Sequence, residues 1–235
     1  MAAICITTAA MLARQSWETE NAYQNLPVQR ILDSEKGEDK KETDWKELRS
    51  QNAEVVAWLT VEGTAISYPV VQPSNNTPDD FYLRHDFWKQ PQADGCPYLD
   101  RRAQAEGQHV LVFGHQLGFS DRMFSMLKDA WKPLSFSSIG TASWITPQED
   151  VLFEPLCACI CDQDFDLIQR FSFNDQTDME TWLDRLVQQA SAQAEAARTL
   201  AEQANRVLTL VTCSNSIPGT RQRTLVVFVA SRQQP

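Results

Sequence analysis

The sequence predicts a mainly β fold, a closed or nearly closed β-barrel with helical insertions. Three observations lead to this fold class. Short runs with strand patterning recur along most of the chain, separated by turn signals. One long stretch, Asp178–Arg206, has a helical composition. The 235 residues, 43% of them hydrophobic, suffice for one domain with a substantial core and argue against a second full domain.

The amino-terminal part of the chain differs from the rest. Ala2–Ala13 is an apolar run, shorter than the roughly 20 residues that a membrane span needs. It is either an ordinary helix or the outer end of a membrane anchor cut short by the start of the sequence. We therefore assign residues 1–16 as the candidate remnant of an anchor, residues 17–43 as a polar linker or helical spacer, and residues 44–235 as the folded barrel domain.

The elements of the barrel follow in chain order. Asp44 is placed to cap a short helix, Trp45–Arg49. Met123–Leu127 predicts a second short helix, and Asp178–Arg206 forms either one helix or two. Strands are predicted at Val55–Val61, Ala65–Val71, Tyr98–Leu99, His109–Phe113, Ser143–Thr146, Val151–Cys161, Asp166–Phe173, Leu208–Thr212 and Thr224–Ala230.

The charge of the chain limits its partners. A formal net charge of -10 disfavours a nucleic-acid binder, because such proteins usually present a basic face. The same acidity disfavours attachment to anionic lipid through a polybasic patch. The chain has no glycine-rich phosphate loop and no Gly-x-Ser-x-Gly elbow, so a nucleotide enzyme or a serine hydrolase is not indicated.

Six cysteines are present, and no pair has the Cys-x-x-Cys spacing of zinc ribbons or redox motifs. Cys157, Cys159 and Cys161 alternate with other residues, so in a strand all three thiols face one side. A disulfide between neighbouring thiols of one strand is geometrically disfavoured, and a metal site would need further ligands from elsewhere. We interpret the three as small core residues and predict neither a metal nor another cofactor.

Two apolar strands end on side chains that can carry out chemistry. Leu208–Thr212 runs into Cys213, and His109–Phe113 runs through a glycine into His115. A cysteine nucleophile needs a proton donor for the leaving amine, and a histidine held at a strand end can supply it. The alternative interpretations are a buried structural cysteine and a hydrogen-bonded turn histidine.

An arginine completes the candidate set. Arg221 and Arg223 are two residues apart before the last strand, so both side chains face the same side if the strand begins early. Either guanidinium could stabilise an oxyanion. Arg223 is favoured because it directly precedes the apolar run of the strand; the alternative is an exposed arginine at a strand start. The remaining histidines, His85 and His109, are predicted to be solvated.

At these positions the sequence resembles the sortases, bacterial cell-wall transpeptidases. Thr209–Cys213 (TLVTC) resembles the TLxTC signature of that family. Further segments match class B members in the same order: Asn52–Leu59, Ile66–Gln72, Asn76 followed by Phe81–Leu83, Gly95–Asp100, Phe113–His115 with Met123–Phe124, and the long helix before the TLxTC strand. The resemblance covers roughly Asp44–Ala230, and the ordered set with its cysteine, histidine and arginine is more specific than one motif.

The resemblance implies a closed eight-stranded sortase-type β-barrel with N-terminal helices and one long helical insertion before the cysteine strand. It implies three catalytic residues. Cys213 would be the nucleophile, His115 the general acid and base, and Arg223 the partner of the substrate carbonyl or oxyanion. Arg221 stays open as the alternative to Arg223.

The substrate contacts are less defined. Asn76 is a groove candidate by position, or else a turn asparagine within Ser74–Pro78. Thr212, beside the nucleophile, is a second candidate. Phe113 stands where many relatives have tyrosine, and Val211 where many have serine, so the polar contacts of those side chains are absent here.

The implied activity is a transpeptidation that needs no cofactor. Cys213 would attack the threonine carbonyl of a sorting motif in a secreted protein, and the thioester would be resolved by a peptidoglycan amine or a pilin lysine. The family also implies a single-pass N-terminal anchor on the outer face of the plasma membrane, with Ala2–Ala13 as its truncated end. Two other functions stay open: a cysteine peptidase that uses water as acceptor, and a non-catalytic β-barrel binding module.

Overall fold

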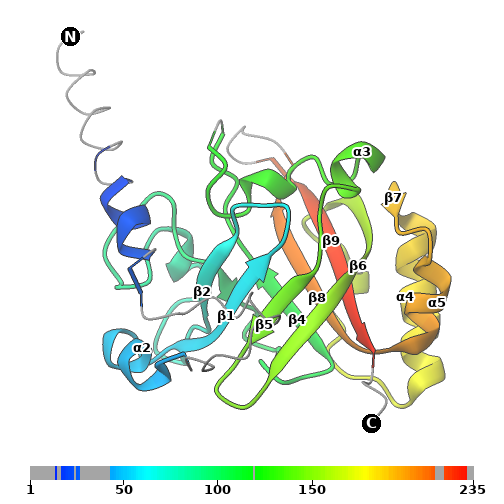
Figure 1. Cartoon of the computed structure of the whole chain (residues 1–235), viewed down its shortest axis with the longest axis horizontal. Coiled ribbons are helices and arrows are strands. Elements are labelled where there is room, and N and C mark those ends of the chain that lie inside the picture. The colour runs from blue at the N-terminus through cyan, green and yellow to red at the C-terminus, as the bar shows by residue number, and fades with distance from the viewer. Residues whose placement is uncertain are drawn as a thin grey trace, which may run out of the picture.

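Eight strands close into a mixed β-barrel in the computed structural model, which describes residue 14 and residues 17–23, 25–26, 43–118, 120–214 and 220–231 (Figure 1). The strands are β1 (Val55–Val61), β2 (Ser67–Val71), β3 (Tyr98–Leu99), β4 (His109–Phe113), β5 (Ala142–Ile145), β6 (Asp150–Asp162), β8 (Ala204–Cys213) and β9 (Gln222–Ser231). A two-residue strand, β7 (Ala192–Gln193), pairs with β6 in addition.

The strand order is β5-β1-β2-β3-β4-β8-β9-β6, and β6 returns to pair with β5. The β2–β3 and β4–β8 pairs are parallel, and the other pairs of the barrel are antiparallel. The closed eight-stranded barrel that the sequence predicted is therefore confirmed.

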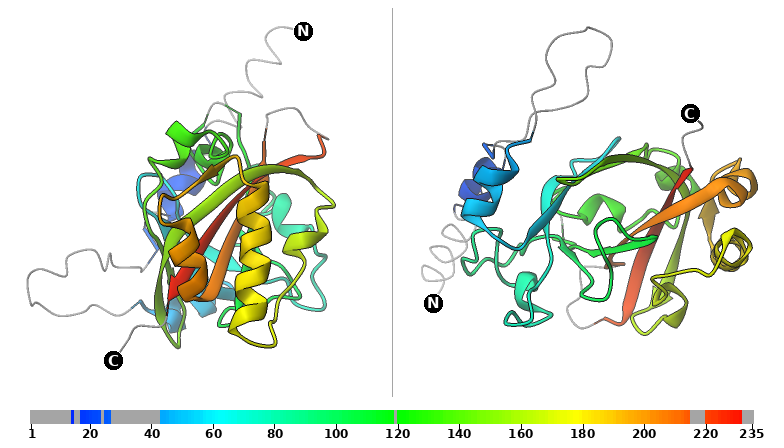
Figure 2. Two further views of the ribbon diagram at one scale, coloured as in Figure 1. Left: turned by 90° about the vertical axis from the view of Figure 1, so that its right-hand side faces the viewer. Right: turned by 90° about the horizontal axis from the view of Figure 1, so that it is seen from below.

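Helices cover two sides of the barrel. α4 (Gln176–Gln189) and α5 (Ala197–Gln203) lie against one side, while α2 (Trp45–Gln51) and the helical residues 17–23 lie at the opposite side (Figures 1 and 2). α3 (Pro133–Phe136) is a single turn. Asp44 caps α2 as predicted, because its side chain accepts a hydrogen bond from the Glu47 amide (2.9 Å). Three 3₁₀ turns occur at Phe81–Leu83, Ser125–Leu127 and Asp166–Ile168.

Alternation along the strands creates two hydrophobic layers. On β8, Leu210 belongs to the layer inside the barrel, whereas Val207 and Val211 belong to the layer beneath α4 and α5. The buried side of α4, which includes Trp182, completes this outer layer. Because Cys213 follows Val211 by two residues, its side chain faces the same outer side of the sheet.

The segment Asp166–Phe173, predicted as a strand, is not one. It begins with the 3₁₀ turn Asp166–Ile168 and continues without strand pairing. The adjacent side chains of Leu167 and Ile168 are both buried, which the alternation of a half-buried strand does not allow. The backbone binds side chains instead of a neighbouring strand: the Leu167 carbonyl accepts a hydrogen bond from Trp182 Nε1 (2.7 Å).

Two further predictions differ from the structure in their extent. The helical stretch Asp178–Arg206 is divided into α4 and α5, because the backbone between them pairs with β6 through β7. Its last residues, Ala204–Arg206, already belong to β8. Met123–Leu127 is helical only as the 3₁₀ turn Ser125–Leu127.

No helix within the described ranges is long and apolar enough to cross a bilayer. The apolar run Ala2–Ala13 lies outside those ranges, as does most of the segment 1–16 that the sequence assigns to an anchor.

His109, predicted to be solvated, is fully buried at the start of β4. Its Nδ1–H donates to the Arg170 carbonyl (2.6 Å), and its Nε2 accepts from the Thr209 hydroxyl (2.9 Å). Burial lowers the pKa of His109 to about 4, although the Arg170 carbonyl and the charge of Asp100 oppose part of that effect. The imidazole is therefore a neutral structural group that joins β4, β8 and the segment after the last 3₁₀ turn.

We expect His109 to make the fold sensitive to acid. An unfolded histidine has a pKa of about 6.5, so the unfolded chain binds a proton that the folded chain excludes. The contribution of His109 is fully present above about pH 6.5 and is lost as the pH falls from there through the folded pKa of about 4. The change is on the order of 3 kcal/mol. Urea denaturation at pH 7 and pH 4.5 measures it.

The control for this experiment is His109→Gln, which removes the titrating group. The wild-type protein should lose more stability between the two pH values than the variant does. Equal losses would contradict the assignment, since they would arise from the carboxylates that both proteins share.

Candidate active site

Strand register places three of the predicted site residues in one row. In the antiparallel β8–β9 pair, Cys213 lies opposite Arg223. In the parallel β4–β8 pair, Phe113 lies opposite Val211. The pairing extends one residue further, because the Gly114 amide donates to the Val211 carbonyl (3.0 Å). His115, two residues beyond Phe113, therefore comes level with Cys213. Cys213 and Arg223 lie near the ends of β8 and β9, and His115 follows the end of β4 on the same side of the barrel.

The row lies where the helical layer ends. One step back along the same face, Val211 and Leu225 are 4% and 0% exposed beneath the helices. Cys213 and Arg223 are half-buried and reach solvent. A thiol at this position is held by a rigid strand and can still meet a substrate, as a nucleophile requires.

A backbone carbonyl holds the ring of His115. The Nε2–H group donates to the carbonyl of Leu83 (2.6 Å), at the end of the 3₁₀ turn Phe81–Leu83. Because a carbonyl only accepts, this bond keeps the proton of the neutral imidazole on Nε2 and leaves Nδ1 as an acceptor. Nδ1 is then the nitrogen that can exchange a proton with the thiol of Cys213 or with a leaving amine.

Gly95 lies against the same ring. Its φ is +65°, and a Cβ built there would lie 3.0 Å from Cδ2 of His115 and 2.5 Å from the carbonyl oxygen of Tyr82. Both the backbone conformation and the lack of space require glycine. Sequence reasoning missed these roles of Leu83 and Gly95. Each lies in a segment that resembles class B sortases, but no side-chain pattern reports a contact made by a backbone carbonyl.

Arg221 is engaged in ion pairs. It contacts Asp162 (2.6 Å) and Asp164 (2.5 Å), and the hydrogen bonds to these two carboxylates raise the pKa of the Arg221 guanidinium. Its positive charge is compensated before any substrate arrives.

Arg223 has only neutral hydrogen-bond partners within the described part of the chain. Its guanidinium donates to the carbonyls of Thr220 (2.6 Å) and Gln222 (3.0 Å) and to the side-chain oxygen of Gln163 (3.3 Å). A guanidinium that forms no ion pair with the described residues, and lies beside the nucleophile, can stabilise an oxyanion. Position and charge therefore both favour Arg223, which lies opposite Cys213, over the other arginine.

Two aromatic rings adjoin the row. Tyr98 lies opposite Phe113 in the β3–β4 pair, and their rings stack with centroids 5.4 Å apart. Burial raises the pKa of Tyr98, and the charge of Asp100 adds to the increase, whereas the nearby charge of Arg223 opposes it. The two half-buried rings lie next to the row on β3 and β4.

The three alternating cysteines of β6 face the outer hydrophobic layer together, as predicted. Cys157 and Cys159 are buried, and Cys161 is half-buried opposite Arg223. Burial raises the pKa of Cys159 to about 11 and that of Cys161 to about 12. These thiols are protonated at neutral pH, as expected of core residues. In the described residues, no three His, Cys, Asp or Glu side chains gather as a metal site.

The two substrate-contact candidates, Asn76 and Thr212, and the third histidine, His85, lie in different surroundings. Asn76 is exposed in the turn between β2 and the first 3₁₀ turn. Thr212 is 2% exposed and faces the barrel interior, away from the face of Cys213. His85, predicted to be solvated, is half-buried: its Nδ1–H donates to the Phe81 carbonyl (2.8 Å), and its ring stacks on that of Phe81.

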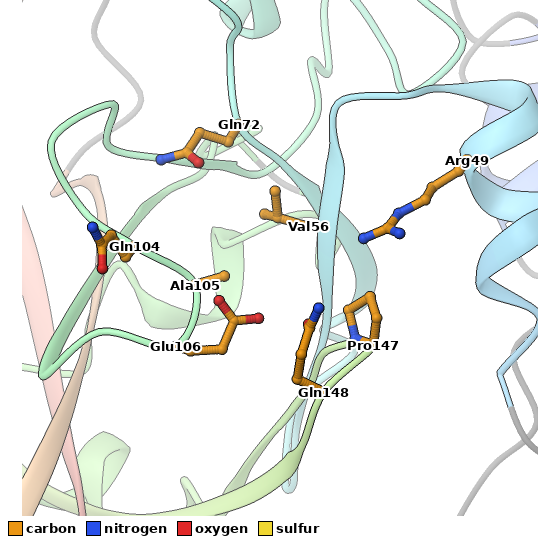
Figure 3. Close-up of a pocket in the computed structure, with 8 residues that line it drawn as sticks. All are labelled: Arg49, Val56, Gln72, Gln104, Ala105, Glu106, Pro147 and Gln148. Carbon is orange, nitrogen blue, oxygen red and sulfur yellow. The ribbon is translucent and has the colours of Figure 1, made fainter.

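A polar cavity of about 320 Å³ lies at the other end of the barrel (Figure 3). It is lined by Arg49, Val56, Gln72, Gln104, Ala105, Glu106, Pro147 and Gln148. The loop that carries Gln104 and Glu106 precedes β4, whereas His115 follows it, so the strand separates this cavity from the row of Cys213.

No protein-family model matches the chain, but two known proteins are similar to it over most of its length. It is 24% identical to sortase B of Staphylococcus aureus over 185 residues, which cover 78% of this chain and 72% of that protein. It is 25% identical to sortase B of Listeria monocytogenes over 204 residues, covering 81% and 80% respectively.

Solved structures agree with the curated relatives. The structure of Clostridium perfringens sortase B matches with a TM-score of 0.67 and 26% identity, covering 79% of this chain and 98% of that one. Sortase B from Bacillus anthracis matches with a TM-score of 0.72 and 20% identity, covering 95% and 99%.

The closed mixed barrel and its similarity to these proteins support the identification of the chain as a class B sortase.

We expect Gly95→Ala to disturb the site and leave the barrel folded. The added methyl group would collide with the Tyr82 carbonyl and displace the ring of His115. Left-handed strain alone costs about 1–3 kcal/mol. The rate at which a small alkylating agent modifies Cys213 should fall about 10-fold, because the thiol loses its histidine partner. Alkylation followed by mass spectrometry measures this rate.

Gly118→Ala is the matched control. Gly118 also has a positive φ, +64°, but a Cβ there meets nothing within 4 Å. It therefore adds the strain without the collision, and the alkylation rate should stay near that of the wild type. If both variants slow alkylation equally, the contact between Gly95 and the histidine does not control the thiol.

Proposed function

We propose that this class B sortase cleaves a sorting motif near the C-terminus of secreted proteins and joins the new end to an amine. The observation that carries the proposal is the strand register: Arg223 lies opposite Cys213 in the β8–β9 pair, and β4, which leads to His115, pairs with β8 as far as Phe113 and Val211. Membership of a family of cysteine transpeptidases supports the same reaction class.

In the first half of the reaction, the Cys213 thiol gives its proton to Nδ1 of His115, and the sulfur attacks the scissile carbonyl carbon. The carbonyl oxygen becomes an oxyanion, which the guanidinium of Arg223 stabilises. When the tetrahedral intermediate collapses, the C–N bond breaks and Nδ1 returns its proton to the leaving amine. The product is a thioester between Cys213 and the protein that carries the motif.

The second half reverses these roles. A neutral amine attacks the thioester carbonyl, and Nδ1 of His115 accepts the proton that the amine loses. The C–S bond then breaks, and the sulfur regains a proton from the imidazolium. The energy of the original amide bond is conserved in the thioester, so no cofactor enters the cycle.

The proposed partners are a protein with a sorting motif and a peptidoglycan amine, with a pilin lysine as the alternative acceptor. Two solved structures of S. aureus sortase B support this choice of partners: one is a substrate complex and one a complex with triglycine, each with a TM-score of 0.67 and 22% identity to this chain. We also propose that the enzyme acts on the outer face of the plasma membrane, held by an anchor that includes Ala2–Ala13, a run outside the described residues.

Intact mass spectrometry with sorting-motif peptides, with and without triglycine, tests this function. A peptide-sized adduct should form on the wild-type protein, and a transfer product should appear only when triglycine is present. Cys213→Ala should form neither. Cys161→Ala is the matched control and should behave as the wild type. Equal cleavage with and without amine would indicate a peptidase, and peptide binding without an adduct on an unreactive Cys213 would indicate a binding module.

The two arginines should differ in kinetics. Arg223→Ala removes the oxyanion partner, so kcat should fall about 10²- to 10³-fold with a smaller change in KM. Arg221→Ala breaks exposed ion pairs and should stay within about 2-fold of the wild type. Transfer rates at saturating triglycine measure both variants. A larger loss for Arg221→Ala would reverse the assignment.

A further inference from the structure

We infer that Tyr82 and Glu54 form a buried hydrogen-bonded unit that positions His115 through the backbone carbonyl of Leu83. The inference rests on the proposed role of His115 as the acid and base. Both residues act through the backbone of the first 3₁₀ turn, so they are positioning residues. Neither belongs to the row of His115, Cys213 and Arg223.

The hydroxyl of Tyr82 holds the side chain in place, because it both donates and accepts a hydrogen bond. The O–H group donates to Oε2 of Glu54 (2.5 Å) and accepts from Nδ2 of Asn52 (2.9 Å). The same amide of Asn52 donates to the Phe87 carbonyl (2.8 Å). The side chain of Tyr82 is fully buried. Movement of its ring would therefore break two hydrogen bonds in a place where water cannot replace them.

The backbone of the same turn reaches the histidine. The Tyr82 carbonyl accepts from the Cys96 amide (2.9 Å), and the next carbonyl, that of Leu83, accepts from Nε2 of His115 (2.6 Å). Gly95 fills the space between the Tyr82 carbonyl and the imidazole. Any shift of the turn therefore moves the acceptor that fixes the tautomer of His115.

Glu54 is a fixed acceptor for this unit. It is 9% exposed, accepts from the Ser74 amide (2.9 Å) and the Thr77 hydroxyl (2.6 Å), and pairs with Lys89 (3.1 Å). Burial acts to raise the pKa of Glu54, but the hydrogen bonds from Ser74, Thr77 and Tyr82 outweigh it and lower the pKa to about 2. The carboxylate is charged at neutral pH. Its partners come from three segments of the chain: the turn with Ser74 and Thr77, the 3₁₀ turn with Tyr82, and Lys89.

The tautomer matters because only an unprotonated Nδ1 can accept the thiol proton. If the Leu83 carbonyl moves away, the neutral imidazole no longer has to carry its proton on Nε2. The fraction with the proton on Nδ1 then rises, and that form cannot act as the base toward Cys213. Loss of the unit should thus lower kcat and leave peptide binding nearly unchanged, because neither residue lies in the row.

Tyr82→Phe tests the inference with the smallest change. The His115 tautomer is measured by nitrogen NMR of the histidine side chains, of which the chain has only three. We expect more Nδ1–H tautomer at His115, a kcat for peptide transfer to triglycine about 10-fold lower, and a KM within about 2-fold of the wild type. Glu54→Gln keeps an oxygen acceptor for Tyr82 and should lie between the wild type and Glu54→Ala.

Thr209→Val is the matched control. It also removes a buried hydroxyl that is hydrogen-bonded to a histidine, but that histidine is His109. It should lower the melting temperature and leave the His115 tautomer unchanged. If Thr209→Val shifts that tautomer as much as Tyr82→Phe does, the effect is general loosening and the inference is overturned.

The two proposals can fail separately. An unchanged tautomer and an unchanged kcat in folded Tyr82→Phe would overturn the positioning role while the transpeptidase stands. A wild-type protein that forms no adduct would overturn the proposed function. The tautomer measurement needs no turnover, so a shift in Tyr82→Phe would still support the link from Tyr82 to His115.

Discussion

The pairing of β8 with β4 on one side and β9 on the other determines where the reactive groups lie. Cys213 is opposite Arg223 in one pair, and His115 follows the ladder of the other. Because side chains alternate along a strand, a slip of one residue in β8 would turn Thr212 outward and Cys213 into the barrel. The hydrophobic layers on both faces of β8 oppose such a slip, so core packing and active-site geometry depend on the same register.

Register sets the row, but it does not orient the imidazole. His115 lies beyond the end of β4, where ladder hydrogen bonds no longer constrain it. The hydrogen bond to the Leu83 carbonyl and the close approach of Gly95 orient the imidazole instead. The segment that supplies the carbonyl is held in turn by the buried contact of Tyr82 with Glu54. Segments distant from Cys213 in the sequence thus hold one side chain in place.

Most of the barrel and the row could be predicted from the sequence, because apolar runs that end on Cys213 and His115 are local patterns. The errors have a common physical origin in contacts between distant segments. Asp166–Phe173 looks like a strand, but its backbone bonds to side chains of the outer layer. His109 has a polar side chain, yet tertiary partners satisfy both nitrogens. The sequence favoured Arg223, but no local pattern reports that two aspartates about sixty residues away engage its neighbour Arg221.

We expect one face of the sheet to present Cys213, His115 and Arg223 to the same substrate carbonyl. A crystal structure of the protein with a sorting-motif mimetic bonded to a cysteine tests it most directly. We expect a bond to Cys213, with the former carbonyl oxygen within hydrogen-bond distance of the Arg223 guanidinium and Nδ1 of His115 facing the sulfur. A bond to Cys161, or an oxygen directed away from Arg223, would contradict it.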